Sequence, residues 1–111
     1  MPEQRPRPSH SVYVIELDLA VLRDRRFRAR NAQHRADSPC VYVGMTGLDV
    51  ALRFENHRRG RKSSRYVQRY GRRLLPGLYE RLNPMPYEVA RQKEVDLAQE
   101  LRERGYAVWQ G

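Results

Sequence analysis

Two tyrosines occupy matching positions in two short runs of β-branched residues. Tyr13 lies within residues 12–15 (Val-Tyr-Val-Ile), and Tyr42 lies within residues 41–44 (Val-Tyr-Val-Gly). Because side chains alternate along a strand, each run would put its phenol on one face of a sheet and its flanking valines on the other. The phenols are either ordinary sheet core, each with a backbone partner, or two titratable groups held together at a site. At Gly44 we expect the chain to turn sharply or to let another group approach closely.

An arginine and a histidine lie four residues apart on the next predicted helix. We expect a turn over residues 44–49, a helix cap from Thr46 or Asp49, and a helix that ends near His57. On a helical wheel His57 falls on the apolar side of this helix, and Arg53 falls at the margin of that side. We therefore expect both side chains to face inward or along a cleft.

A glutamate lies inside the apolar stripe of the last predicted helix, which runs from about Tyr87 to Arg104 and ends at Gly105. Glu94 falls between the apolar residues of this stripe on a helical wheel. Burying a carboxylate without a partner costs several kcal/mol. Glu94 therefore either pairs with an arginine such as Arg53 or binds a metal ion.

The charge of the chain favours a polyanionic partner. The formal net charge is +9, and no apolar run approaches the length of a membrane span, so nucleic acid is the leading candidate and a membrane is not. The alternative is a protein that is basic over its whole surface. The densest basic segment is interleaved with Tyr66, Val67 and Tyr70, and its cations are Arg58, Arg59, Arg61, Lys62, Arg65, Arg69, Arg72 and Arg73. These cations would contact phosphates, and the aromatic rings would either stack on bases or form the buried stripe of a helix.

The remaining chain indicates one domain of the α+β class. A length of 111 residues suits a single core. We expect residues 1–10 to be a flexible tail rich in proline and arginine, and residues 11–111 to form the domain. Strands are predicted at residues 11–19, 40–43 and 106–109, with a short helix or turn within residues 74–82. A long, polar and mobile excursion is predicted at residues 20–38.

The compartment follows from the cysteine count and the start of the chain. Cys40 is the one cysteine, which excludes an internal disulfide and a zinc site built from cysteines. The first residues have no apolar core of the kind that a secretory signal needs. We therefore expect a cytoplasmic protein.

The order of these residues resembles the GIY-YIG nuclease superfamily over residues 11–109. Tyr13 matches the tyrosine of the first signature. The other matches are Tyr42 and Gly44 in the second signature, Arg53 for the catalytic arginine, His57 for a frequent histidine, and Glu94 for the metal-binding glutamate. The first signature lacks its glycine, and the link between the two signature strands is unusually long. The last strand lacks the asparagine of many members, and we hypothesise that Gln110 replaces it.

The resemblance implies a small, mostly antiparallel sheet of about three strands flanked by helices, acting as a metal-dependent DNA endonuclease of the repair, recombination or restriction type. Glu94 would hold one Mg²⁺ or Mn²⁺, and Arg53 would bind the scissile phosphate. One tyrosine, assisted by the other or by His57, would take a proton from water. Its pKa of about 10 would have to be lowered by Arg53 and the metal.

The chain has no room for a separate targeting domain. We therefore expect either a preference for DNA shape, such as branches or flaps, or dependence on a homodimer or a targeting partner. The alternative is a non-catalytic nucleic-acid-binding module of the same fold. Composition alone does not separate DNA from RNA as the ligand.

Overall fold

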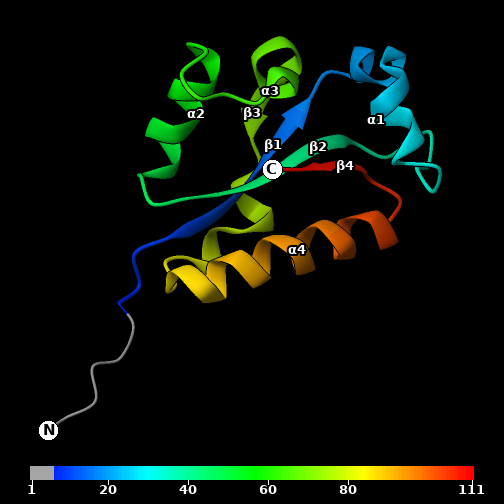
Figure 1. Cartoon of the computed structure of the whole chain (residues 1–111). Coiled ribbons are helices and arrows are strands. Elements are labelled where there is room, and N and C mark those ends of the chain that lie inside the picture. Colours follow the sequence, from blue (N-terminus) through cyan, green and yellow to red (C-terminus); the bar gives the residue numbers. More distant parts are fainter. Residues whose placement is uncertain (1–6) are drawn as a thin grey trace, which may run out of the picture.

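The computed structural model describes residues 7–111 and contains a four-stranded sheet with helices on both faces (Figure 1). The strands lie in the spatial order β3-β1-β2-β4. Their bounds are Ser11–Leu17 for β1, Cys40–Thr46 for β2, Gly71–Leu74 for β3 and Ala107–Gln110 for β4. β1 is antiparallel to both β2 and β3, whereas β2 and β4 are parallel. The α+β class is confirmed, and the sheet is mixed.

The predicted count of about three strands is wrong for the described residues, because β3 forms a fourth. β3 has the sequence Gly-Arg-Arg-Leu, which lacks the β-branched residues that mark the other strands. It is an edge strand paired only with β1, so only part of it needs to be apolar. β3 is defined by its antiparallel pairing with β1, and no local sequence pattern predicted this strand.

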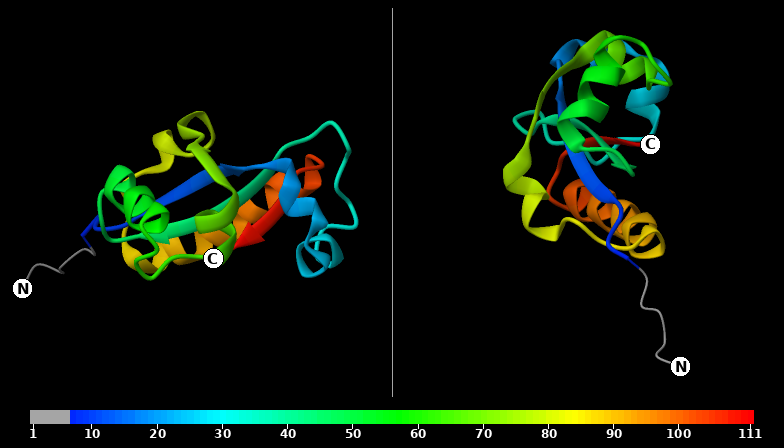
Figure 2. Two further views of the ribbon diagram at one scale, coloured as in Figure 1. Left: turned by 90° about the horizontal axis from the view of Figure 1, so that it is seen from above. Right: turned by 90° about the vertical axis from the view of Figure 1, so that its left-hand side faces the viewer.

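Helices lie on both faces of the sheet. α4 covers one face, and α1, α2 and α3 lie on the other (Figures 1 and 2). The helices are α1 Arg25–Ala29, α2 Val50–Arg58, α3 Arg65–Tyr70 and α4 Tyr87–Glu103. Three short 3₁₀ helices accompany them: η1 Leu19–Arg23, η2 Pro76–Leu78 and η3 Glu80–Leu82. No helix within residues 7–111 is long and apolar enough to cross a membrane.

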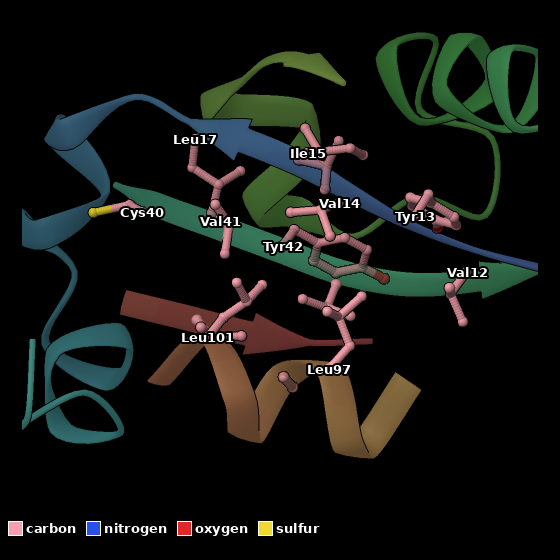
Figure 3. Packing of buried hydrophobic residues seen from close by; sticks show 14 of the residues in the cluster. Val12, Tyr13, Val14, Ile15, Leu17, Cys40, Val41, Tyr42, Leu97 and Leu101 are labelled. Atoms are coloured by element: carbon pink, nitrogen blue, oxygen red, sulfur yellow. The ribbon is translucent and has the colours of Figure 1, made fainter. Parts of the chain in front are cut away.

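One part of the core lies between α4 and the sheet. Val14 and Val41 are completely buried, and Leu97 and Leu101 point from α4 toward the strands (Figure 3). The spacing of Leu97 and Leu101 puts them on the same side of the helix. The predicted end of this helix at Gly105 is confirmed, since Gly105 has a φ of +92°, a conformation that glycine adopts without strain.

The segment between β1 and β2, which was predicted to be a long, polar excursion, is packed against the rest of the fold. It contains η1 and α1, and Val21 and Phe27 are completely buried. The buried Asn31 accepts a hydrogen bond from the Val108 N–H at 2.7 Å and donates to the Val108 carbonyl at 3.1 Å. These bonds attach the segment to the outer edge of β4, where a further strand would otherwise pair.

Several boundaries differ from the prediction. β1 ends at Leu17, two residues early, because Asp18 caps η1 by accepting from the Ala20 N–H. β2 continues to Thr46, so the chain does not turn at Gly44. Asp49 caps α2, as one of the two predicted alternatives, and accepts from the Leu52 N–H at 3.2 Å.

The predicted tail lies largely outside the described part of the chain, which begins at residue 7. Arg7, Pro8 and Ser9 are exposed. His10 already pairs with Met85 through backbone hydrogen bonds of 2.9 and 2.8 Å. The fold therefore begins by His10, before the predicted boundary.

Candidate active site

Two phenols and an imidazole form a buried cluster between the sheet and α2. Tyr13 and Tyr42 come from the neighbouring strands β1 and β2, and Figure 3 shows both rings on the sheet. Their ring centroids are 6.2 Å apart. His57 from α2 lies 6.0 Å from the Tyr13 ring and 5.4 Å from the Tyr42 ring. The structure thus brings together three residues that lie far apart in the sequence.

Gly44 makes room for this cluster. It lies directly opposite Tyr13 in the antiparallel register of β1 and β2. A Cβ atom at position 44 would lie 2.6 Å from the Cζ and Oη atoms of Tyr13 and 2.9 Å from the Tyr42 ring. The predicted close approach at Gly44 is therefore confirmed, and the approaching group is the Tyr13 phenol.

The hydrogen bonds of His57 assign its tautomer. The Ser64 backbone N–H donates to Nδ1 at 3.2 Å, so Nδ1 carries no proton. Nε2 then carries the proton and donates to the Tyr13 hydroxyl oxygen at 2.9 Å. Burial and, secondarily, the charge of Arg53 lower the pKa of His57 to about 4. His57 is therefore a neutral donor at neutral pH, and in this state it cannot accept a proton from Tyr13.

The two phenols are protonated in the protein alone. Burial raises the pKa of Tyr13 and of Tyr42 above the usual value, and the charge of Arg53 opposes the rise at both. A tyrosine acting as a base would need additional positive charge at the site. His57 would help at Tyr13, because a donor stabilises a phenolate more than a phenol.

Arg53 is held in place by the loop after α2. Its guanidinium donates to the Lys62 carbonyl at 3.0 Å and to the Arg61 carbonyl at 3.4 Å. Gly60 and Lys62 both have positive φ, so this loop turns back on itself and presents its carbonyls to the helix. A guanidinium has five N–H donors, so the Arg53 side chain keeps donors for a further ligand.

Of the two alternatives predicted for Glu94, the structure does not contain the ion pair with Arg53. The Arg53 guanidinium binds backbone carbonyls on the α2 side of the sheet, and Glu94 comes from α4 on the other side (Figure 1), although both charges act on Tyr13 and Tyr42. Glu94 is 7% exposed and accepts a hydrogen bond from Nε2 of Gln110 at 3.0 Å. Burial raises the pKa of Glu94, and the Gln110 hydrogen bond opposes the rise.

Gln110 thus lies beside the predicted metal-binding glutamate. Because its Nε2 donates to Glu94, its Oε1 faces away from that bond and can accept from water or contact a cation. The sequence singled out Gln110 as the amide nearest the end of the last strand. Its role as a replacement for the missing asparagine remains a prediction.

The donor set at Glu94 fits a hard cation better than zinc. Within residues 7–111 no three His, Cys, Asp or Glu side chains lie together as a metal-binding group. Mg²⁺ commonly binds through one or two carboxylates and takes its other oxygens from water and substrate phosphates. A single Mg²⁺ or Mn²⁺ held by Glu94 therefore matches the residues present, with Gln110 as a neighbouring oxygen donor.

A cleft of about 740 Å³ opens beside the cluster. Tyr42 and Gln110 belong to its wall. The other lining residues are Asp24, Arg25, Arg26, Ala29, Ser64, Arg65, Tyr66, Trp109 and Gly111. The sequence analysis named none of Arg25, Arg26 and Trp109 as site residues, although the polar excursion that contains the two arginines was a candidate for DNA contacts. The density of arginines in residues 20–38 was a usable signal, but nothing local placed them beside β4.

The predicted nucleic-acid-binding segment is not one continuous face. All eight of its cations are exposed, while Tyr66 and Val67 are buried, so the segment combines a basic surface with a buried stripe. Arg65 lines the cleft. Arg72 and Arg73 instead lie on β3 at the far edge of the sheet, where they pair with Asp18 at 3.8 Å and Glu16 at 3.2 Å.

No protein-family model, curated protein or solved structure matches this chain. The resemblance to GIY-YIG nucleases therefore rests on the order of the residues described above. The site residues Tyr13, Tyr42, Arg53, His57 and Glu94 keep their predicted roles as a hypothesis.

Proposed function

We propose that this protein is a metal-dependent DNA endonuclease, a phosphodiester hydrolase of the GIY-YIG type. The observation that carries the proposal is the hydrogen-bonded pair of Tyr13 and the neutral His57, packed against Tyr42. Burying a histidine and a phenol costs desolvation free energy that their mutual hydrogen bond offsets, whereas apolar side chains would pack at this place without that cost. Such a pair suits a site where negative charge develops on a phenol.

Each residue of the cluster has a role in this proposal. Arg53, held by two carbonyls, would bind the scissile phosphate and neutralise charge on its oxygens. A divalent ion bound at Glu94 would supply further positive charge at the phosphate and at the leaving oxygen. Gln110 would orient the Glu94 carboxylate through its hydrogen bond.

Tyr42 is the better candidate for the residue that takes a proton from water. It lines the cleft, whereas Tyr13 does not and is only 1% exposed. The oxygen of Tyr13 already accepts a hydrogen bond from His57. His57 would orient the Tyr13 hydroxyl, and hydrogen bonding from Tyr13 would favour the anionic form of Tyr42.

The second candidate is a nucleic-acid-binding module without turnover. The specific observation in its favour is the burial of both phenols, which raises the pKa of Tyr13 and of Tyr42 and keeps them protonated. On this alternative the basic surface binds nucleic acid and the cluster only supports the fold.

A cleavage assay separates the two candidates. Plasmid and branched DNA are incubated with Mg²⁺ or Mn²⁺ and with wild type, Glu94→Gln or Tyr42→Phe. We expect wild type to cut and each variant to lose activity by roughly a hundredfold or more while still binding DNA. Glu103→Gln on the exposed face of α4 is the matched control and should cut normally.

Wild type that binds DNA but cuts none of the substrates with either metal would favour the binding module. Adding a partner protein or raising the concentration tests the predicted dependence on a targeting partner or a homodimer. RNA substrates run in parallel decide which nucleic acid is the ligand.

A further inference from the structure

The cleft beside Tyr42 has a wall of aromatic rings. Trp109 on β4 is partly exposed and lies 4.5 Å from the Tyr66 ring, measured between centroids. On the core side Phe27 lies nearly parallel to Trp109 at 6.3 Å. The exposed Arg30 places its guanidinium 4.9 Å from the centre of the Trp109 ring. Trp109 also lines the cleft, whereas Arg30 does not, so a planar group in the cleft can contact the indole while Arg30 keeps its place.

The cleft is lined by both acidic and basic side chains, which interact differently with a nucleobase and with a phosphate. Arg25, Arg26 and Arg65 are exposed and line the cleft. Asp24 also lines it, and its Oδ1 accepts from the Phe27 N–H and the Tyr66 hydroxyl, both at 2.9 Å. The carboxylate repels phosphate but can accept a hydrogen bond from the amino group of a base, while the arginines attract phosphates.

The cleft and the candidate active site share a wall. Tyr42 belongs to the phenol cluster, Gln110 binds Glu94, and both line the cleft. A nucleic-acid strand with its scissile phosphate between Arg53 and a cation held by Glu94 would therefore bring an adjoining nucleotide to the cleft. Its volume of about 740 Å³ lies within the range of small-molecule sites and is large enough for a nucleotide.

We propose that the cleft binds one unpaired nucleobase next to the phosphate that is cut, stacked on Trp109. The adjoining phosphates would lie against Arg25, Arg26 and Arg65, and the base would lie against the part of the indole that lines the cleft. A base inside a duplex is already stacked on both faces and cannot reach the indole. The substrate class is therefore DNA with an unpaired nucleotide at the cleavage position, such as a flap, bulge or single strand. The position of the bound base relative to the cut rests on the proposed nuclease function, whereas the stacking of a base on Trp109 does not depend on that function.

Trp109 is the one tryptophan of the chain, so its fluorescence reports on the cleft directly. Binding is measured without divalent metal, so that no DNA is cut. Three ligands of equal length are compared: a duplex with one unpaired nucleotide, the same duplex with an abasic site in its place, and a fully paired duplex. Anisotropy of labelled DNA gives the affinity, and quenching of Trp109 reports stacking.

We expect strong quenching by the unpaired nucleotide only, and an affinity about 5- to 150-fold higher than for the abasic ligand. Ala29→Phe introduces a large side chain at an exposed position in the lining of the cleft and should remove this preference. Trp109→Leu should remove it as well, with affinity for paired DNA unchanged. Equal quenching by the unpaired and abasic ligands, or an unchanged preference in Ala29→Phe, would overturn the proposal.

The result is independent of cleavage. Base-dependent quenching in a protein that never cuts DNA supports the base site and contradicts the nuclease function. Cleavage by a protein that shows no base-dependent quenching supports the nuclease function and overturns the base site.

Discussion

The burial of His57 predicts a specific loss of stability in mild acid. His57 is completely buried, and its pKa in the folded protein is lowered to about 4 from the usual 6.5. The unfolded chain therefore binds a proton on this residue more readily than the folded protein does. Stability from this group is fully present above pH 6.5, falls as pH drops from about 6.5 to about 4, and is constant below that range.

The magnitude follows from the two pKa values. A tenfold difference in proton affinity corresponds to about 1.36 kcal/mol, so the interval from 6.5 to about 4 corresponds to roughly 3 kcal/mol. This loss is a large share of the free energy of unfolding of a typical domain, which is roughly 5–15 kcal/mol. The loss should be visible even though carboxylates also titrate in this range.

The assay is urea unfolding at closely spaced pH values from about 4 to about 7.5, with wild type compared to His57→Gln. Glutamine can still donate from its Nε2 to the Tyr13 oxygen but does not titrate. Subtracting the free energy of unfolding of the variant from that of wild type at each pH removes the contribution of the carboxylates, which both proteins share. We expect wild type to lose roughly 3 kcal/mol relative to the variant between pH 7 and pH 4.

Leu52→Ala is the control, because Leu52 is exposed on α2 and the substitution changes no titratable group. The stability curve of this variant should run parallel to that of wild type. Parallel curves for wild type and His57→Gln would refute the reasoning. Such a result would mean that His57 is not a buried neutral donor. It would also contradict the assigned hydrogen bond from His57 to Tyr13.

Two further predictions concern the packing around the site. Gly44→Ala would put a Cβ 2.6 Å from the Tyr13 phenol and should lower the free energy of unfolding by about 1–3 kcal/mol. Gly77→Ala is the control, because a Cβ there meets nothing within 4 Å, and it should change the free energy of unfolding by less than about 0.5 kcal/mol. Equal effects of the two variants in urea unfolding would contradict the close approach of the Tyr13 phenol to Gly44. Asn31→Ala leaves the buried Val108 N–H without its partner and should cost about 1–3 kcal/mol. Hydrogen exchange of the Val108 amide should accelerate in the same variant, and unchanged protection would show that Asn31 does not anchor the segment.

Local patterns in the sequence determined most of the elements that carry the candidate site. Alternating β-branched residues around Tyr13 and Tyr42 predicted both strands, since this period matches a pleated chain. The stripe of α4 predicted that Glu94 is buried, because helical spacing fixes which residues share a face. The cap at Asp49 was also recognisable locally.

Only the tertiary structure decided how these elements meet. The register of β1 against β2 puts Gly44 opposite Tyr13, and the fold of the loop after α2 directs Arg53 to backbone carbonyls instead of Glu94. The parallel pairing of β4 with β2 brings Trp109 beside Tyr42. Strand register and pairing depend on contacts between distant segments, which leave no period in either segment alone.

The cleft is the clearest example of a feature that no single segment encodes. Its wall combines residues of α1, β2, α3 and β4, which lie far apart along the chain. The sequence showed that arginines are dense in residues 20–38 and that one tryptophan ends the last strand. Burial of Phe27 and the hydrogen bonds of Asn31 to β4 place those arginines beside the indole, because a polar segment takes its position from the few groups that anchor it.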